Sequence, residues 1–542
     1  MDFVSYFNYE RHAPVVPPLE GRREPRRHAV AVVGGGPIGL AVAMGLARQG
    51  IASVVLEADD SVCEGSRAGC VTSRTLEILE PMGAAAAIMG QGLPWAEGWS
   101  YHGTAEVLHL DIPRDELAMF PRLVNIQQCY IEQYLLDAIR ARYADLIDIR
   151  WRTCVEAVRN GTGGAELDLA TPLGNYTLSA DWVVAADGAR STVRKALGAR
   201  FVGTRYDGQY IIADIKMAST LPPGRRAWFD PPSNPGATLL LHKHRDDLWR
   251  FDYQLREGED PEEATRPENV LERIRGHLEL MGEHAPWQPV WISLYRASCL
   301  TLENYCHGRV LLAGDAAHLV PIFGVRGLNS GMEDANNLAW KLAFAIRGWG
   351  GARLLESYTA ERLFATRENM RHASKSAEFM APPAPAFALM RSAVLGLAGR
   401  HPWVRRLIDP RQSTTVGYPG SPLNQADQEA HFTAGPASGF ALLDGPLADG
   451  SQLCQHMGPG FTALAFDAPD LAPGLAASPM SPAVPVEVVE AAVDGPLGRR
   501  YDARPGTVYL FRPDGNLLAR WRDASTDAIR AAIQLCRDGG TP

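Results

Sequence analysis

The chain has 542 residues, of which 46% are hydrophobic and 21% charged, a composition typical of a globular protein with about three to four domains. Its formal net charge of −9 disfavours nucleic acid and an anionic membrane as partners, because both attract clustered Lys and Arg. Its eight cysteines form no C-x-x-C pair, and it has no long apolar run and no apolar N-terminal leader. From these features we expect no disulfide scaffold, no membrane span and no signal peptide, and the expected compartment is the cytoplasm.

The first elements in the chain predict a βαβ unit. Residues 1–27 are expected to form an N-terminal arm, with the basic run Arg22–Arg27 as a solvated tail. The short β-branched run His28–Val33 indicates a buried parallel strand, and the glycines after it end that strand. A helix over 38–49 and a second strand over 53–56 follow.

The turn between the first strand and the helix, residues 34–39, fits G-x-G-x-x-G. Gly34 permits the tight turn, Gly36 lets the backbone approach a pyrophosphate, and Gly39 lets helix and strand pack closely. The N-terminus of the helix, next to Pro37, would offer free N–H groups to the phosphates. Glu57 ends the second strand 18 residues after Gly39, where a carboxylate accepts ribose hydroxyls. The sequence therefore predicts a dinucleotide site and leaves NAD and FAD open at this point.

Later segments predict an inserted sheet inside this α/β domain. Residues 201–295 contain alternating stretches that are typical of a half-exposed antiparallel sheet. The flanking parts, 28–200 and 296–380, are expected to form one discontinuous domain. Its further elements are helices over 73–81 and 128–143, strands over 182–186 and 309–313, and a long helix over 328–347.

The C-terminal part is expected to be separate. Prolines after residue 380 mark a break, so 381–425 are predicted to be a helical linker and 426–542 a further α/β unit. That unit ends in a strand over 507–511, a strand over 516–521 and a helix over 526–536.

Two more motifs follow buried strands. Asp187-Gly188 leads into Ser191 and Arg194, giving D-G-x-x-S-x-x-R. Gly314-Asp315 comes after the next strand, and His318, Pro321 and Gly327-Leu328-Asn329 follow it at the start of the long helix.

The order of these motifs over residues 29–380 resembles the aromatic-ring flavoprotein hydroxylases of the para-hydroxybenzoate hydroxylase type. The longer subgroup, such as phenol hydroxylase and 3-(3-hydroxyphenyl)propionate hydroxylase, is the nearest match, since Gly458-x-Gly460-Phe461 and Phe511–Asn516 resemble its extra domain. The resemblance implies a doubly wound, Rossmann-like FAD-binding domain, an inserted antiparallel substrate sheet and a thioredoxin-like C-terminal domain. Without C-x-x-C, that last domain is expected to be structural or to form a homodimer.

The activity implied by the resemblance is aromatic-ring hydroxylation in aromatic catabolism. NADH or NADPH would reduce FAD, O₂ would add to the flavin as a C4a-hydroperoxide, and a phenolic compound would be hydroxylated without a metal. Two alternatives stay open: a tailoring hydroxylase of a polyketide or other natural product, and an FAD-binding protein that does not hydroxylate.

Family positions give the expected site residues. Asp315 would bind the ribityl chain, Arg67 the phosphates, and Gln128, with Gln127 as its neighbour and rival, the ribityl region. The helix start at Gly327 would face the flavin N1/O2 edge, while Asp187 would serve the turn, FAD or NAD(P)H. The complete FAD set is Gly34, Gly36, Pro37, Gly39, Glu57, Arg67, Gln128, Asp187, Gly314, Asp315, Gly327, Leu328 and Asn329.

Substrate-side residues are expected mainly in the inserted sheet. Arg250 would reach the flavin; the alternative is an exposed strand arginine with no such role. Tyr210 and His242 would bind or deprotonate a phenol; the alternative is that each is an ordinary strand residue. Pro321 would line the pocket. Many relatives read P-P-x-x-G-Q-G-M/L-N, whereas this chain has Pro321-Ile322-Phe323-Gly324-Val325-Arg326-Gly327, so the pocket wall differs and the substrate stays open.

Overall fold

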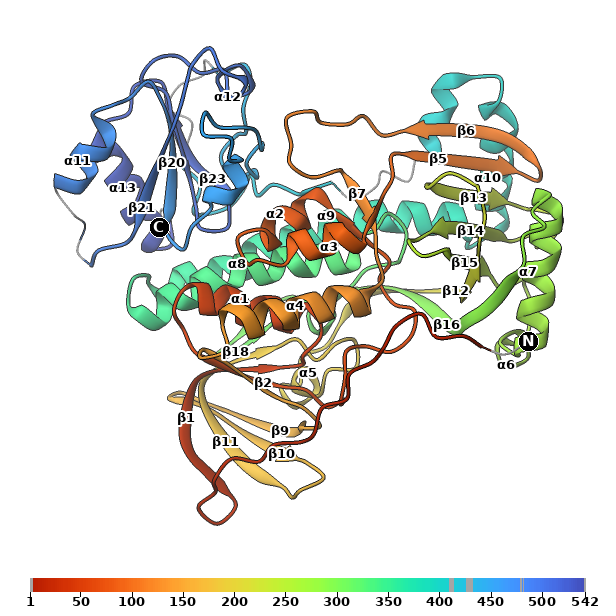
Figure 1. Ribbon diagram of the computed structural model, residues 1–542, viewed down its shortest axis with the longest axis horizontal. Helices are drawn as coiled ribbons and strands as arrows, with labels where there is room; N and C mark the ends of the chain where they lie inside the picture. Colours follow the sequence, from red (N-terminus) through yellow and green to blue (C-terminus); the bar gives the residue numbers. More distant parts are fainter. Residues whose placement is uncertain (1–2, 409–413, 426–431, 478–479, 481, 541–542) are drawn as a thin grey trace.

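The computed structural model describes residues 3–408, 414–425, 432–477, 480 and 482–540. Two eight-stranded sheets form the larger part of the molecule, and a four-stranded sheet forms a C-terminal unit on one side of it (Figure 1). A small sheet joins β3 (Cys70–Thr72), β7 (Leu123–Asn125) and β4 (Leu93–Pro94).

The first sheet contains the predicted βαβ unit. Five of its strands pair in parallel around β1, and the crossover between the first two is α1 (Pro37–Arg48). In Figure 1, α1 and α4 (Gln128–Arg142) lie on one side of this sheet. Its strands are, in order, β17 (Cys306–His307), β18 (Val310–Leu312), β11 (Tyr176–Ala185), β1 (Arg23–Val33), β2 (Ser53–Leu56) and β8 (Ile147–Arg150), with β10 (Gly164–Ala170) and β9 (Cys154–Gly161) continuing from β11.

The N-terminal arm is shorter than predicted: most of the basic run belongs to strand β1 rather than to a tail, although its arginines are exposed, as expected. Strand β1 begins at Arg23, because its first residues pair with β11. Glu24 is buried and accepts hydrogen bonds from Arg150 Nη1 at 2.7 Å and Nη2 at 2.9 Å. The one acid of this run is therefore paired inside the fold, which the local sequence did not reveal.

The second sheet extends beyond the predicted 201–295. Residues 97–111, assigned from sequence to the first domain, contribute two strands, because β5 pairs with β13 in parallel. At the other end β16 continues to Thr301. The strand order is β19 (His318–Leu319), β16 (Trp287–Thr301), β12 (Val202–Met217), β15 (Leu248–Gln254), β14 (Thr238–Lys243), β13 (Arg225–Phe229), β5 (Glu97–His102) and β6 (Ala105–Asp111).

The prediction that this sheet is half-exposed was also wrong. One face is covered by α7 (Pro267–Met281), whose Val270, Ile274 and Leu278 pack in one apolar cluster with the sheet. The opposite face packs against Phe323 and against α10 (Pro385–Ala398). Burial on both faces explains why β15 is buried along almost its whole length.

Two long helices connect the sheets to the C-terminal unit. The predicted long helix is α8 (Gly327–Arg347), and it packs closely on α1, since a Cβ on Gly45 would lie 2.6 Å from the Ala339 Cβ. The next helix, α9 (Ala352–Met380), was not predicted. Shorter helices are α2 (Ser73–Leu79), α3 (Ala85–Gln91), α5 (Thr192–Ala196), α6 (Pro261–Ala264), η1 (Gly314–Ala316) and η2 (Pro402–Leu407).

The C-terminal unit has a mixed sheet of order β21-β20-β22-β23. The first two strands pair in parallel and the other two antiparallel. The turn at 512–515 between β22 and β23 reaches α8 and α9. The unit consists of η3 (Leu453–His456), β20 (Phe461–Phe466), α11 (Leu471–Ala477), β21 (Val486–Ala491), α12 (Pro496–Arg500), β22 (Val508–Phe511), β23 (Leu517–Trp521) and α13 (Thr526–Arg537).

Candidate active site

The glycine turn between β1 and α1 contains two glycines that the fold itself requires. Gly34 has φ +102°, and a Cβ there would lie 2.5 Å from the Ala186 carbonyl oxygen. A Cβ on Gly39 would lie 1.9 Å from the Gly34 carbonyl oxygen. Pro37 is the first residue of α1, so the helix begins and ends one residue earlier than the predicted 38–49. These glycines allow the close strand–helix packing that the motif needs.

Gly36 differs because nothing in the fold requires it. The nearest atom to a Cβ on Gly36 is Glu132 Oε1, at 4.0 Å. Gly327, at the start of α8, has nothing within 4 Å of such a Cβ. Both glycines stand at helix N-termini, where backbone N–H groups favour anions. The open space at these two points fits the pyrophosphate and the flavin end of FAD.

Glu57 ends β2 and closes the glycine turn from the side. Its Oε2 accepts a hydrogen bond from the Gly35 N–H at 2.5 Å, and its Oε1 accepts one from the Asp59 N–H at 2.9 Å. Burial raises the pKa of this carboxyl. Glu57 therefore holds the turn in place, in addition to the ribose contact expected of it.

Gln128 lies at the start of α4 and supports the loop before β3. Its Oε1 accepts a hydrogen bond from the Ala68 N–H at 3.3 Å, and its Nε2 donates to Glu132 Oε1 at 2.8 Å. Glu132 Oε2 accepts from the Cys63 N–H at 2.6 Å. Sequence reasoning did not assign Glu132 to the site, although its spacing of four from Gln128 places both on one helix face. Burial raises the pKa of Glu132 to about 7.

FAD affinity is expected to fall as the pH rises above about 7, because ionised Glu132 would repel a pyrophosphate at Gly36. Protonation then accompanies FAD binding, and affinity decreases by up to about tenfold per pH unit above that value. In Glu132→Gln the affinity for FAD should not change with pH over this range. Fluorescence titration of the apoprotein with FAD across this range measures both profiles, and the same slope in the two proteins would contradict the role of Glu132.

The Gly314–Asp315 turn lies at the end of β18. Gly314 has φ +59°, and its N–H donates to Asp334 Oδ2 at 2.9 Å. Asp315 is exposed, yet the protein around it raises the pKa of its carboxyl, against the opposing charges of His318 and Arg67. An accessible carboxylate enclosed by protein on its other sides is suited to accept hydroxyl hydrogen bonds from a ligand.

Asp334 supports this turn and was missed from sequence. It is fully buried and also contacts His318 Nε2 and Arg362 Nε, each at 2.6 Å. Burial alone would raise its pKa, but the charges of His318 and Arg362 hold it below the ordinary value. The only sign of this role in the sequence was that Asp334 falls on the side of the long helix predicted to be buried.

Asp315→Ala is expected to weaken FAD binding by roughly 10- to 150-fold, because a charged hydrogen bond contributes about 1.5–3 kcal/mol. The side chain is exposed, so the variant should keep its fold. Glu303→Ala, at an exposed acid in the same region of the chain, is the matched control. Equal FAD dissociation constants for the variant, the control and the parent protein would show that Asp315 does not bind FAD.

The start of α8 is fixed by the Asn329 side chain. Its Oδ1 accepts hydrogen bonds from the Thr72 N–H at 2.9 Å and Thr75 Oγ1 at 2.6 Å, and its Nδ2 donates to the Val325 carbonyl at 2.9 Å. The side chain is thus engaged within the protein, and Gly327–Asn329 can contribute only backbone N–H groups and the exposed part of Leu328 to a cofactor.

The two remaining FAD candidates, Asp187 and Arg67, differ in what surrounds their side chains. Asp187 Oδ2 accepts from the Val193 N–H at 3.1 Å and so supports its own turn, while its buried Oδ1 has no partner among the described residues. Arg67 is exposed, and its positive charge lies close enough to Asp315 to oppose the rise in the pKa of that carboxyl.

Arg250 joins the second sheet to the loop at Ser66 and Arg67, which we call the FAD-side loop. Its Nε donates to Asp214 Oδ1 at 3.2 Å, its Nη1 to the Arg67 carbonyl at 2.7 Å and its Nη2 to Ser66 Oγ at 2.5 Å. It is 7% exposed, which rules out the alternative of an exposed strand arginine. Whether it also contacts a flavin stays a prediction.

Register places several polar side chains beside Arg250 on the same face. His242 lies opposite Arg250, and Asp252 is two residues along β15. Burial lowers the pKa of His242 to about 3, helped by the charges of Arg225 and Arg250, and burial raises the pKa of Asp252 to about 7. This part of the face therefore carries a neutral imidazole and a carboxyl that titrates near neutrality.

The other end of the same face is aromatic. Tyr210 is buried, and its ring centroid lies 5.3 Å from that of Phe323, in the loop that begins at buried Pro321. Tyr295 lies directly opposite Tyr210 in the register of β12 and β16. Sequence reasoning missed Tyr295, which strand alternation in β16 would have placed on this face.

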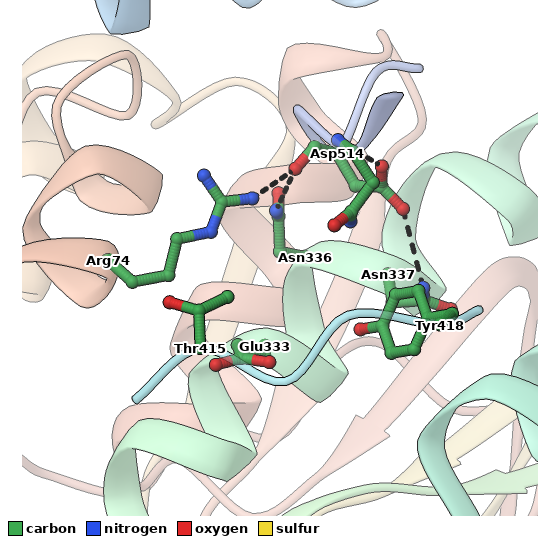
Figure 2. Close-up of a pocket in the computed structure, with 8 residues that line it drawn as sticks. Arg74, Glu333, Asn336, Asn337, Thr415, Tyr418 and Asp514 are labelled. Carbon is green, nitrogen blue, oxygen red and sulfur yellow. Dashed lines mark hydrogen bonds between the residues drawn. The ribbon is translucent and has the colours of Figure 1, made fainter. Parts of the chain in front are cut away.

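A separate polar hollow of about 200 Å³ lies where α8 meets the C-terminal unit. Figure 2 shows Arg74 and Asn336 pointing toward the Asp514 carbonyl, to which they donate at 2.6 and 2.8 Å. None of the site residues predicted from sequence lines it. The lining residues are Arg74, Glu333, Asn336, Asn337, Thr415, Tyr418, Asp514 and Asn516.

A parallel sheet with an open glycine cradle after its first strand and an acid after its second defines a dinucleotide-binding protein. The family described as FAD binding domain matches residues 27–373, and the chain belongs to this family. This confirms the family that the motifs predicted. No helix among the described residues is long and apolar enough to cross a membrane.

Known proteins similar to this chain include hydroxylases and monooxygenases. The 3-(3-hydroxy-phenyl)propionate/3-hydroxycinnamic acid hydroxylase of Mycolicibacterium smegmatis is 27% identical over 384 residues, which is 70% of this chain and 66% of that protein. The matched segments span 56 to 66% of the length of the first such relatives.

Two solved structures resemble almost the whole chain. The flavin-dependent monooxygenase PieE, in complex with FAD and substrate, has a TM-score of 0.77 at 20% identity and covers 94% of this chain and 99% of its own. OxyS anhydrotetracycline hydroxylase from Streptomyces rimosus has a TM-score of 0.71 at 26% identity and covers 95% of this chain and 100% of its own. The mixed α/β fold is therefore that of FAD-dependent hydroxylases.

Proposed function

We propose that this protein is an FAD-dependent monooxygenase that hydroxylates a phenolic ring, with NADH or NADPH as electron donor and O₂ as oxygen source. The observation that carries the proposal is the second sheet, whose polar and aromatic face is tied to the FAD-side loop by Arg250. That arrangement would place a buried polar and aromatic surface for a small aromatic compound beside the residues proposed to bind FAD.

Residues from three segments of the FAD-binding domain would hold FAD. Gly36 and the α1 N-terminus would receive the pyrophosphate, Glu57 the adenosine ribose and Asp315 the ribityl hydroxyls, with Arg67 and Gln128 between them. The α8 N-terminus would face the pyrimidine end of the flavin. Bound FAD would supply the redox and oxygen chemistry, which no side chain of the protein can perform.

The substrate-facing side chains would orient the ring and take its phenolic proton. The neutral imidazole of His242 and the carboxyl of Asp252 offer acceptors at a desolvated position, and Asp252 Oδ1 has no partner among the described residues. Tyr210 and Pro321 would pack against the ring. Burial of the whole face would exclude water and favour productive oxygen transfer.

The proposed domains follow from the sheets. An FAD-binding, doubly wound domain would span 28–200 and 296–380, except that 97–111 join the substrate sheet of 201–295. A linker over 381–425 leads to a C-terminal domain over 426–542, whose strand order and pairing support a thioredoxin-like assignment. A cytoplasmic homodimer is the proposed state of the enzyme.

A panel of phenols tests the function. Substrate-stimulated NADH or NADPH oxidation by the FAD-loaded protein, with a product heavier by one oxygen atom, is the expected result. Labelled O₂ should place the label in the product. FAD binding without stimulated oxidation or product, for every phenol tested, would refute the proposal and favour a non-hydroxylating FAD protein.

A tailoring hydroxylase of a polyketide is the second candidate. It is supported by the near-complete overlap with an anhydrotetracycline hydroxylase, and by Ile322 and Phe323 in the loop where many relatives differ. The same panel separates the two functions if it includes fused-ring phenols. Turnover of these alone would assign the tailoring role, and turnover of single-ring phenols would assign the catabolic one.

A further inference from the structure

Helix α10 and η2 carry an unusual concentration of exposed apolar side chains. Six of the thirteen large apolar side chains exposed among the described residues fall within 387–407. We call these six the α10–η2 patch. They are Phe387 (38% exposed), Leu389 (74%), Met390 (54%), Leu397 (46%), Trp403 (69%) and Leu407 (59%).

The helix is apolar on both of its sides. Its inner side, with Val394, Leu395 and Ala398, is buried in the same apolar cluster as Tyr210 and Phe323. On its outer side Leu389, Met390 and Leu397 stand at helical spacing and are exposed. A helix that is apolar all round is normally covered all round, so the outer side requires an occupant.

The charges of this segment indicate what kind of occupant fits. Residues 381–408 contain four arginines and neither Asp nor Glu, although the whole chain has a net charge of −9. Arg400 and Arg406 are exposed and flank Trp403, whereas Arg391 is buried and donates to the Met380 carbonyl at 3.1 Å. Exposed leucines beside tryptophan and arginine are typical of helices that lie on an anionic lipid surface.

A second copy of the chain fits less well. A two-fold interface would bring the α10–η2 patch against itself, so Arg400 and Arg406 of one copy would face the same cations of the other. The segment has no acid of its own to pair with them. Anionic headgroups would pair with the arginines, and acyl chains would cover the leucines.

We propose that the α10–η2 patch docks the protein peripherally on an anionic lipid bilayer. The net charge of the whole chain does not decide binding here, because only the charges within about 8–10 Å of the surface act on it at physiological ionic strength. The inner side of α10 packs on the sheet face with Tyr210, so docking would bring this side of the second sheet to the membrane. In Figure 1 this end of the molecule lies away from the C-terminal unit.

Vesicle co-sedimentation of the full-length, FAD-loaded protein tests the proposal. Binding is expected with phosphatidylcholine vesicles that contain about 30% phosphatidylglycerol, and not with phosphatidylcholine alone. Leu389→Ser with Trp403→Ser should weaken binding more than tenfold by removing buried apolar area. Arg406→Gln should weaken it about fivefold, which is the effect of about 1 kcal/mol per basic residue. Leu173→Ser, at a 65% exposed leucine in the β10–β11 turn, is the matched control and should bind like the parent.

Three outcomes would overturn the proposal. One is equal sedimentation with both kinds of vesicle, and another is undiminished binding by the double variant. The third is a lipid-free dimer that the double variant converts to a monomer in analytical ultracentrifugation, which would assign the patch to a second copy. FAD content and the circular dichroism spectrum verify that each variant is folded, so the result does not depend on turnover.

Discussion

Gly36→Val is expected to yield a folded protein that has lost its yellow FAD. A Cβ on Gly36 meets nothing nearer than Glu132 Oε1 at 4.0 Å, so the fold accepts a side chain there. The valine would occupy the space where the backbone of the α1 N-terminus would otherwise approach a pyrophosphate. The Gly36 φ of −72° is open to any residue, so backbone strain does not enter.

Absorbance of the purified variant and titration of its apoprotein with FAD measure this loss, and we expect affinity to fall by at least about a hundredfold. Gly39→Ala is the contrasting variant, because its Cβ would lie 1.9 Å from the Gly34 carbonyl oxygen and should impair folding itself. A yellow Gly36→Val protein with full FAD occupancy would place the cofactor elsewhere.

The βαβ unit and its glycine turn were predictable because their signals are local. Gly36 and Glu57 lie within one βαβ unit, whose spacing follows from the turn geometry of the backbone. Glu132 and Asp334 gave no such signal, because a buried acid is recognised only when the groups that donate to it are known. Asp334 receives its hydrogen bonds from Gly314, His318 and Arg362, which lie 20, 16 and 28 residues away from it in the sequence.

The extent of the second sheet could not be predicted for a similar reason. The strands at 97–111 alternate weakly, and their membership depends on the pairing of Arg225 with Gly98, more than a hundred residues away. Burial of both sheet faces depends on α7 and α10, which follow later in the chain. Local alternation indicated the strands of β12, β14 and β15, and tertiary contacts decided what covers them.

The Phe511–Asn516 segment was recognised from the sequence, but its role in the C-terminal unit is visible only in the structure. The turn at 512–515 inserts Arg512 and Asp514 against α8 and α9. Arg512 Nη1 donates to Glu361 Oε1 at 2.5 Å, and Lys341 Nζ donates to Glu361 Oε2 at 2.6 Å. All of these charges are buried. Glu361 thus joins the C-terminal unit, α8 and α9 through ionic hydrogen bonds.

Glu361→Gln is therefore expected to be strongly destabilising. A neutral amide leaves Lys341 and part of Arg512 uncompensated inside the protein, and breaking a buried ion pair costs about 3–5 kcal/mol. The midpoint of urea unfolding should fall, and limited proteolysis should release the C-terminal unit sooner. Asp168→Asn, in the surface pair with Arg159, is the control and should change stability by less than about 1 kcal/mol.

The pH dependence gives the sharper test of Glu361. Burial alone would raise its pKa, but Arg512 and Lys341 hold that pKa well below the ordinary carboxyl value. A depressed folded pKa gives stability that is present above the unfolded pKa of about 4.3 and is lost as the pH falls below it. The stability difference between the parent and Glu361→Gln should therefore be full at neutral pH and shrink in acid. A difference that stays constant from neutral pH into acid would mean that the charge of Glu361 does not stabilise the contact between α8, α9 and the C-terminal unit.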